Sequence, residues 1–287
     1  MGKIVIVGSG PAGCSAALYA ARAGQEVVVI SMGMGALSKA ELIQNYYGFE
    51  EGITGAELYR QGVAGAKAVG AEFITAEVVG LDYTGSLVVQ TTEGDYPADA
   101  VILATGTGRI APKIAGLAEH EGRGVSYCAT CDAFFYRGKT AAVLGSGEYA
   151  LHEVQALLPL AGRVILCTNG EPLTADFPEG VEICTEKLAA VEGEEKVSAL
   201  RLENGELLPV EGLFVALGVA GSAALARKLG APVENGRIVV DERMQTGIPG
   251  LYAAGDCTGG LLQVCKAVYE GALAATEAIK MLRGKKR

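Results

Sequence analysis

The N-terminal stretch Lys3–Gly13, KIVIVGSGPAG, decides the fold. An apolar strand runs into the glycines Gly8, Gly10 and Gly13, and an alanine-rich helix then leads to a second apolar strand at Glu26–Ile30. In this G-x-G-x-x-G pattern the first glycine allows a tight turn, the second lets the backbone approach a pyrophosphate, and the third lets helix pack on strand. The helix N-terminus adds amide donors and partial positive charge. The stretch therefore predicts a βαβ dinucleotide-binding unit.

One part of this fingerprint is missing at the end of the second strand. An acidic residue at that position usually holds the ribose hydroxyls of the nucleotide. Here the strand ends in Ile30-Ser31-Met32. We therefore expect Ser31 or backbone groups to hold the ribose instead.

A second segment, Thr140–Cys167, repeats the pattern of strand, glycine turn, helix and strand. Alternating segments at Leu87–Tyr96 and Val197–Leu208 predict antiparallel sheet beside each unit. The fold class that follows is α/β, with two Rossmann-like dinucleotide-binding domains of the three-layer ββα type, the second inserted into the first. We expect the outer domain to comprise residues 1–109 plus 241–287, and the inserted domain residues 110–240.

The bulk composition excludes several classes of protein. Of the 287 residues, half are hydrophobic and 20% are charged, which favours buried cores over disorder. The formal net charge of −9 disfavours nucleic acid, because an acidic surface repels phosphates. No apolar run is long enough to predict a transmembrane helix, and the seven scattered cysteines are not a disulfide framework. We expect a cytoplasmic protein with reduced thiols that binds neither nucleic acid nor membrane.

The sharpest chemical signal is Cys128-Ala129-Thr130-Cys131-Asp132. Two thiols at this spacing can close a small disulfide ring, and a nearby donor or dipole can stabilise one of them as the reactive thiolate. Asp132 can move the proton that thiol–disulfide exchange requires. Half of a zinc site is the alternative, but the only histidines are His120 and His152, and there is no second C-x-x-C. We therefore expect a redox pair and no metal.

Four of these motifs together resemble the low-molecular-weight thioredoxin reductases, and the resemblance covers nearly the whole chain. They are Gly8–Gly13, Ala104-Thr105-Gly106, Cys128–Asp132 and Gly255-Asp256, and the run CATCDAFFY at Cys128–Tyr136 is the most specific. The resemblance implies a homodimer with FAD in the outer domain and a thioredoxin-like protein as substrate.

The same resemblance implies roles for individual residues. Cys131 would face the flavin, Cys128 would attack the substrate disulfide, and Asp132 would act as acid and base. The FAD contacts of the family map onto Ser9, Pro11, Ala12, Leu37, Asn45, Val78, Thr105, Gly106, Asp256, Gln263 and Val264. Gly8, Gly10, Gly13, Ser31, Ala104 and Gly255 complete the expected FAD site.

The second glycine turn departs from a working nicotinamide site. Glu148 stands where the helix N-terminus would receive phosphate, and Tyr149 adds bulk. A carboxylate a few Å from a phosphate costs about 1–4 kcal/mol. The NADPH-dependent members of the family have a His-Arg-Arg cluster after the next strand, but here no Arg or Lys occurs between Val164 and Lys187. Cys167-Thr168 offers no acid for NAD either. We expect NAD(P)H binding to be weak or absent, so that the inserted domain is NAD(P)H-like with a degenerate nucleotide site.

Without a nicotinamide, the electrons need another source. The runs Ile43–Phe49 and Gly259–Val264 are similar to the ferredoxin-dependent flavin thioredoxin reductases. A plant-type ferredoxin lies near −400 mV and thioredoxin near −270 mV, so two electrons release about 6 kcal/mol. The leading hypothesis is an FAD-dependent thioredoxin-disulfide reductase fed by ferredoxin or flavodoxin.

Three alternatives stay open at this stage. The first is an NAD(P)H-dependent thioredoxin reductase of the same fold, which flavin bleaching by NADPH or NADH would reveal. The second is a dithiol oxidase, which would release peroxide. The third is a redox sensor that binds flavin without turnover, although the joint presence of Cys128, Cys131 and Asp132 favours an enzyme.

Overall fold

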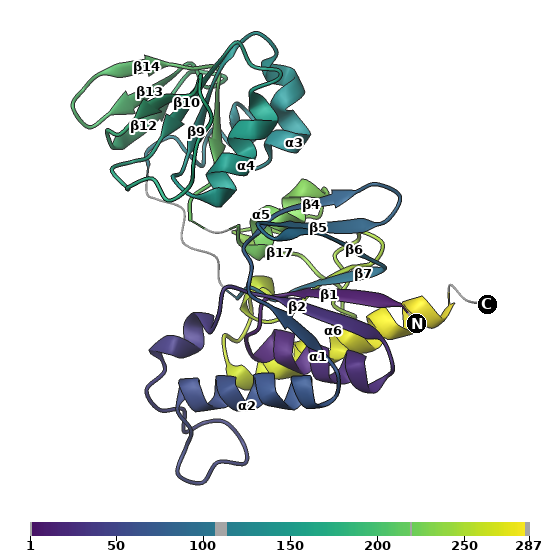
Figure 1. Cartoon of the computed structure of the whole chain (residues 1–287). Helices are drawn as coiled ribbons and strands as arrows, with labels where there is room; N and C mark the ends of the chain where they lie inside the picture. The colour runs from purple at the N-terminus through teal and green to yellow at the C-terminus, as the bar shows by residue number, and fades with distance from the viewer. Residues whose placement is uncertain (1, 107–113, 219, 285–287) are drawn as a thin grey trace. The chain divides into compact units, whose positions relative to one another are not determined.

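The computed structural model describes residues 2–106, 114–218 and 220–284. The chain divides into two compact units, Met1–Gly108 with Gly221–Arg287 and Arg109–Ala220 (Figure 1). The second junction falls at residue 220 rather than at the expected 240. The reason is that α5 (Ser222–Lys228) packs on β4 (Val78–Tyr83) of the first unit.

A parallel sheet forms the centre of the first unit. Its strand order is β18-β7-β1-β2-β3, namely Leu251–Ala253, Ala100–Leu103, Lys3–Val7, Glu26–Ile30 and Glu72–Ile74. The helices α1 (Pro11–Arg22), α2 (Gly55–Ala68) and α6 (Val264–Gly284) lie on one face (Figure 1). An antiparallel sheet of β4, β5 (Leu87–Thr91) and β6 (Gly94–Ala98) lies on the other. The three layers are those expected for a ββα dinucleotide fold.

Small residues let the helices α1 and α6, which lie far apart in the sequence, pack closely against each other. The alanines of α1 and α6 are buried in one core cluster with the apolar side chains of β1 and β2. A Cβ atom on Gly271 would lie 2.0 Å from the carbonyl oxygen of Ala12, so α6 can lie against α1 at this point only with glycine there. The close contact fixes the first residues of both helices near one another.

The second unit repeats this architecture. Its parallel sheet has the order β11-β10-β9-β15-β8, namely Glu182–Cys184, Arg163–Cys167, Thr140–Leu144, Gly212–Val215 and Val125–Ser126. The helices α3 (Ala129–Asp132) and α4 (Glu148–Leu157) lie on one side and an antiparallel sheet on the other (Figure 1). That sheet consists of β12 (Leu188–Glu192), β13 (Ala199–Leu202) and β14 (Leu207–Pro209). The predicted fold class, two Rossmann-like domains with one inserted into the other, is confirmed.

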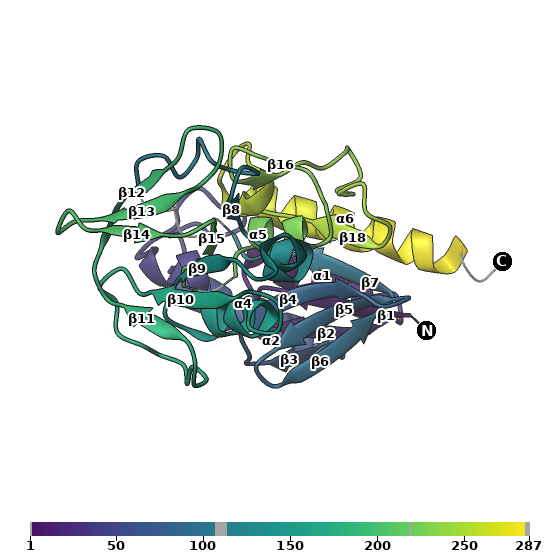
Figure 2. The same ribbon diagram turned by 90° about the horizontal axis from the view of Figure 1, so that it is seen from above.

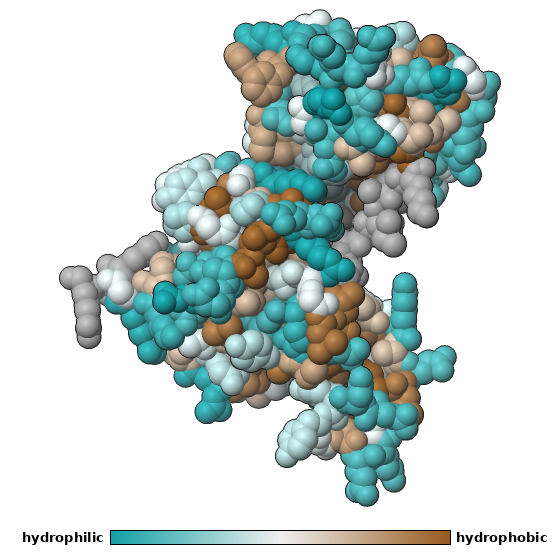
Figure 3. All heavy atoms as spheres, turned by 180° about the vertical axis from the view of Figure 1, so that it is seen from behind, coloured by the Kyte–Doolittle hydropathy of each residue, from teal (hydrophilic) through white to brown (hydrophobic). Residues whose placement is uncertain are grey.

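Shorter elements complete the described chain. They are the 3-10 turns η1 (Gly35–Lys39), η2 (Ala133–Tyr136) and η3 (Asp256–Thr258) and the strand pair β16 (Val233–Glu234) and β17 (Arg237–Ile238). Within the described ranges, no helix has both the length and the hydropathy needed to cross a bilayer. The face in Figure 3 shows hydrophilic surface with smaller apolar areas between.

Candidate functional site

The expected nucleotide-binding residues of the first unit gather at one edge of its parallel sheet. Gly8, Ser31, Ala104 and Gly255 each follow closely on the carboxyl end of a strand. Because the strands are parallel, these ends share an edge, which is where open α/β sheets bind ligands. Gly8 has a φ of +108°, and a Cβ atom there would lie 2.3 Å from the carbonyl oxygen of Ala104. Its turn therefore requires glycine.

The N-terminus of α1 has the features of a pyrophosphate site. Gly10 is the N-cap, Pro11 opens the helix, and no acidic residue lies in the first turn. A Cβ atom on Gly10 would meet no atom within 4 Å, whereas one on Gly13 would lie 1.9 Å from the carbonyl oxygen of Gly8. Gly13 is thus required by packing, and Gly10 borders open space. A helix N-terminus with free space before it suits an anionic ligand.

Ser31 joins a hydroxyl network beside this turn. The Oγ atoms of Ser9 and Ser31 are 2.8 Å apart, and the Ser9 Oγ atom is 3.0 Å from the hydroxyl of Tyr59. The amide of Gly33 donates to Ser31 Oγ at 3.0 Å. The end of β2 therefore presents hydroxyl groups in place of the missing acid, and Tyr59 was not among the expected residues.

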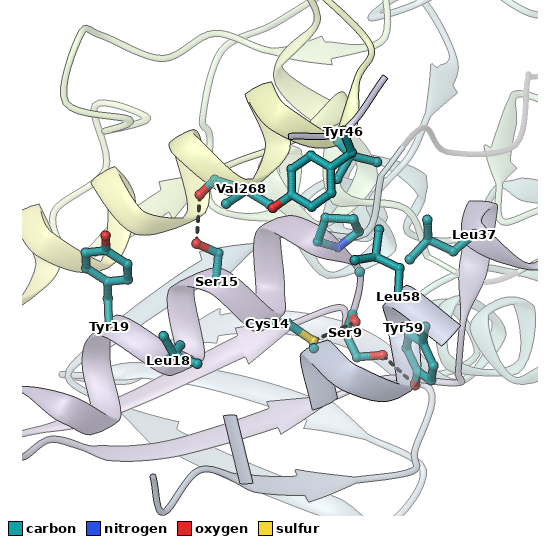
Figure 4. Close-up of a pocket in the computed structure, with 14 residues that line it drawn as sticks. Ser9, Cys14, Ser15, Leu18, Tyr19, Leu37, Tyr46, Leu58, Tyr59 and Val268 are labelled. Carbon is teal, nitrogen blue, oxygen red and sulfur yellow. Dashed lines mark hydrogen bonds between the residues drawn. The ribbon is translucent and has the colours of Figure 1, made fainter. Parts of the chain in front are cut away.

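An apolar cavity lies beside the glycine turn (Figure 4). Five of the expected FAD residues line it, namely Ser9, Gly10, Pro11, Leu37 and Val264. Tyr46 and Tyr59 also contribute rings to its wall, and Figure 4 shows Tyr59 bonded to Ser9. Residues from α1, α2 and α6 thus enclose one site next to the N-terminus of α1.

Three of the remaining expected contacts, Thr105, Asn45 and Gln263, take part in long-range hydrogen bonds. Thr105 follows β7 and shares a hydrogen bond of 2.7 Å with Ser222, whose amide donates to Thr105 Oγ1 at 2.8 Å. Asn45 donates to the side chain of Gln263 at 2.9 Å, which links the loop before α2 to the start of α6. Gly106 ends the described segment after β7, Ala12 lies in α1, and Val78 begins β4 in the antiparallel layer.

A lysine and a glutamate that the sequence analysis missed hold the loop after β18. The Lys266 ammonium donates to the carbonyl oxygens of Gly255 and Gly259 at 2.8 and 2.6 Å and to the Thr258 hydroxyl at 2.9 Å. It also lies 2.9 Å from the Glu270 carboxylate, which accepts from the amide of Gly255 at 2.8 Å. The spacing of four residues on one helix face is the signal that could have revealed this pair. The ion pair of Lys266 and Glu270 therefore holds the loop that contains Asp256 against α6.

The second unit carries Cys128 and Cys131 joined in a disulfide, with Cα atoms 5.3 Å apart. Cys128 is buried and Cys131 is exposed. The amide of Cys131 donates to the sulfur of Cys128 at 3.1 Å, which favours a thiolate at Cys128 when the bond opens. Ser126 donates to Asp132 at 2.7 Å, so the carboxylate is held next to the pair.

Two further side chains from α4 support the cysteine segment. Glu153 is fully buried and accepts a hydrogen bond from the amide of Ala129. Tyr149 is also buried, and its hydroxyl donates to the carbonyl oxygen of Tyr127 at 3.0 Å. The Tyr149 ring therefore packs inside the second unit and bonds to Tyr127, contrary to the expectation that it crowds the glycine turn.

The second glycine turn has the backbone geometry of the first but not its open space. A Cβ atom on Gly145 would lie 2.2 Å from the carbonyl oxygen of Ala216, just as Gly8 meets Ala104. A Cβ atom on Gly147, however, would lie 3.0 Å from Thr174 Oγ1. The amide of Thr174 donates to the carbonyl oxygen of Ser146 at 2.8 Å. The chain around Thr174 therefore lies against the glycine turn of the second unit, whereas the corresponding turn of the first unit borders open space at Gly10.

The described residues contain no group of three or more acidic, histidine or cysteine side chains placed to hold a metal ion. Two glycine-turn units and a disulfide on the inserted unit define a class of flavin- and nucleotide-linked disulfide enzymes. The chain belongs to the pyridine nucleotide-disulphide oxidoreductase family, whose model it matches over residues 2–271. It is an oxidoreductase that acts on a sulfur group.

Within that family the chain is a homologue of the thioredoxin reductases, which bind FAD. It is 35% identical to the thioredoxin reductase of Aquifex aeolicus over 99% of this chain and 94% of that protein. Among solved structures, it resembles the atypical thioredoxin reductase TRi from Desulfovibrio vulgaris Hildenborough, with 40% identity, a TM-score of 0.93 and 99% coverage of both chains. A ferredoxin-flavin thioredoxin reductase from Clostridium acetobutylicum is 35% identical with a TM-score of 0.75, covering 99% of this chain and 98% of the other.

Proposed function

We propose that this chain is an FAD-dependent reductase of a thioredoxin-like disulfide, and that ferredoxin or flavodoxin, rather than NAD(P)H, supplies its electrons. The observation that carries the choice of donor is the contrast between the two glycine turns. Gly10 borders open space, whereas Gly147 lies against Thr174. An acidic residue, Glu148, also stands in the first turn of α4, while the first turn of α1 has none.

The first unit has the groups that FAD needs. The amides at the start of α1 suit the pyrophosphate, Ser31 and Tyr59 offer hydroxyls, and the loop after β18 brings Asp256 to the same edge. When bound, FAD would supply the two electrons that reduce the Cys128–Cys131 disulfide. The exposed sulfur of Cys131 is the one open to a reductant, and Cys128 is the leaving group that the Cys131 amide stabilises.

The reduced pair then performs ordinary thiol–disulfide exchange. The Cys128 thiolate attacks one sulfur of the substrate disulfide, a mixed disulfide forms, and the other substrate sulfur leaves and takes a proton from Asp132. Cys131 gives its proton to the Asp132 carboxylate, attacks the sulfur of Cys128 and releases the second substrate thiolate, which takes that proton from Asp132. The substrate gains two electrons and two protons, and Cys128–Cys131 is oxidised again. Because Cys128 is buried in the oxidised chain, substrate access requires the segment around it to open.

The surface beside the pair suits a protein substrate. Phe134 and Phe135 are each 66% exposed, and they follow directly on the cysteine segment. Exposed aromatic side chains are enriched in protein interfaces. We propose a thioredoxin-like partner at this surface, a homodimer as the assembly and the cytoplasm as the location.

The donor is tested by anaerobic absorbance of the purified yellow protein. We expect no bleaching with stoichiometric NADPH or NADH and full bleaching with reduced ferredoxin or flavodoxin. Lys187, whose side chain lies beside Gly170 near the end of β10, favours a nicotinamide site, because it brings a cation to that edge. Stoichiometric bleaching by NADPH would overturn the donor proposal and leave an NAD(P)H-dependent reductase.

The thiol chemistry is tested separately. The Cys128→Ser variant should retain FAD but lose reduction of thioredoxin disulfide, and the Cys265→Ser variant, at an exposed unpaired cysteine, should keep both. Peroxide release on addition of a reduced dithiol would instead favour an oxidase. Activity that persists in Cys128→Ser would remove the pair from the mechanism.

A further inference from the structure

Two cysteines outside the Cys128–Cys131 pair lie side by side in the second unit. Cys167 is the last residue of β10 and Cys184 the last residue of β11, and they are register partners in the parallel sheet. Neighbouring strands are about 4.8 Å apart, and disulfides span Cα distances of about 4.4–6.8 Å. Partners in register project to the same face of a sheet. The backbone alone therefore places the two thiols within bonding reach.

The side chains of Cys167 and Cys184 also lie in the same surroundings and interact with each other. Cys167 belongs to the core cluster that faces the antiparallel sheet, and Cys184 packs against the same cluster. The two thiols share a hydrogen bond, which raises the pKa of Cys167 and lowers the pKa of Cys184 to about 6. Burial further raises the pKa of Cys167, and the hydrogen bond from the Glu186 backbone further lowers that of Cys184. The direction of the two shifts favours the thiolate at Cys184 and the proton at Cys167.

The two cysteines differ in exposure to solvent: one can be reached by a reagent and the other is buried beside it. Cys184 is partly exposed on β11, the edge strand of the sheet next to β10 (Figure 2). Cys167 is fully buried. A reagent from solution reaches Cys184 first, and the adduct then has a second thiol beneath it. Bidentate contacts of Arg163 with Glu182 hold the same two strands together.

We propose that Cys167 and Cys184 form a second thiol–disulfide couple, which exchanges with low-molecular-weight disulfides at the carboxyl edge of the sheet in the second unit. In dinucleotide folds this strand end reads the ribose of the nucleotide. Here the position holds a thiol pair instead. The couple does not depend on FAD, on the electron donor or on the thioredoxin-like substrate.

The exchange balances in two steps. The Cys184 thiolate attacks one sulfur of the reagent disulfide, the S–S bond of the reagent breaks, and one half leaves as a thiolate. Cys167 then gives up its proton to that thiolate, attacks the Cys184 sulfur and releases the second half, which takes a proton from water. The two cysteines lose two electrons and two protons in total, and the reagent disulfide becomes two thiols.

The test uses the full-length holoprotein, first reduced and then incubated with oxidised glutathione at pH 7. After alkylation of the remaining thiols, trypsin releases Val164–Lys187 as one peptide with both cysteines, because no Lys or Arg lies between them. We expect this peptide to lose both alkyl groups and to be two hydrogens lighter than the reduced form. Further cleavage after Glu179 or Glu182 should give fragments that stay joined until a reductant is added.

Three variants separate the steps. Cys167→Ser should trap a glutathione adduct on Cys184, and Cys184→Ser should leave Cys167 free to alkylate after unfolding. Cys265→Ser, at an exposed cysteine of the other unit, should form the Cys167–Cys184 link as the wild type does. Formation of Cys128–Cys131 in the same digest shows that the incubation was oxidising enough.

Two results in the wild type would overturn the proposal, and neither depends on how the variants fold. One is full alkylation of Cys167 and Cys184 under conditions that oxidise Cys128–Cys131 completely. The other is a stable glutathione adduct on Cys184 that Cys167 never displaces.

Discussion

Replacing Lys266 by Met should loosen the loop after β18 more than any other single loss of charge on α6. The ammonium contacts Glu270 and three oxygen acceptors of the Gly255–Gly259 segment, and the side chains of Lys266 and Glu270 are only 14% and 12% exposed. Methionine keeps much of the apolar stem but leaves the Glu270 carboxylate without its cation. A buried carboxylate without its cation strongly destabilises the folded protein, because its charge is then neither hydrated nor paired.

The size of the effect follows from this burial. Breaking a fully buried ion pair costs about 3–5 kcal/mol, and the residual exposure here reduces our expectation to about 2–4 kcal/mol. Glu270→Gln should cost less than Lys266→Met, because Lys266 keeps its contacts with Gly255, Gly259 and Thr258. The double variant should be more stable than the sum of the two single losses predicts, since neither charge is then left alone.

The assay is urea unfolding of the FAD-free and FAD-bound protein, with bound FAD measured by absorbance. Lys280→Met is the matched control, because Lys280 pairs with Glu277 on the same helix but is 65% exposed. Because the Lys280 ammonium lies in solvent, its loss should cost about 0–1 kcal/mol, although the Glu277 side chain is only 12% exposed. If Lys266→Met were no more destabilising than Lys280→Met and bound FAD equally well, the inferred support of the loop by this pair would be refuted.

Three further outcomes follow from single positions. Gly10→Ala should leave the FAD-free protein within about 0.5 kcal/mol of wild type, because its Cβ atom meets nothing within 4 Å, yet weaken FAD binding measured by fluorescence. Asp132→Asn should slow thioredoxin-disulfide reduction about 100-fold in stopped-flow traces while Ser126 still orders the loop, and an unchanged rate would remove Asp132 as the proton donor. Alkylation of Cys184 should decline as pH falls through about 6, since the thiolate is present above that pKa, and in Cys167→Ala, which lacks the hydrogen-bond donor, the midpoint should move upward.

The sequence was sufficient for the central elements because their signals are local. The run Glu26–Ile30 predicted β2 with the bounds that the structure has, and the glycine-turn pattern predicted strands where β1 and β10 lie. These strands are buried on both faces, so their sequences are continuously apolar and leave no ambiguity of register.

The supports of the site were not predictable because they act across long sequence separations. Ser222 bonds to Thr105 across a sequence separation of 117 residues. Glu153 reaches the amide of Ala129 from another helix, and nothing local marks a glutamate on an apolar helix face as buried. Such residues become visible only when the tertiary arrangement brings a donor to each acceptor.

The comparison of the two glycine turns shows which part of the motif carries information about a ligand. Gly8 and Gly145 both have positive φ and both face a carbonyl oxygen too closely for a Cβ atom, so packing alone retains them. A turn of this kind therefore persists whether or not a nucleotide binds. What differs is the space beyond the second glycine, which is open at Gly10 and bordered by Thr174 at Gly147. Because Thr174 lies well outside the motif in sequence, the glycines predict the fold of both units equally but cannot by themselves predict which unit binds a dinucleotide.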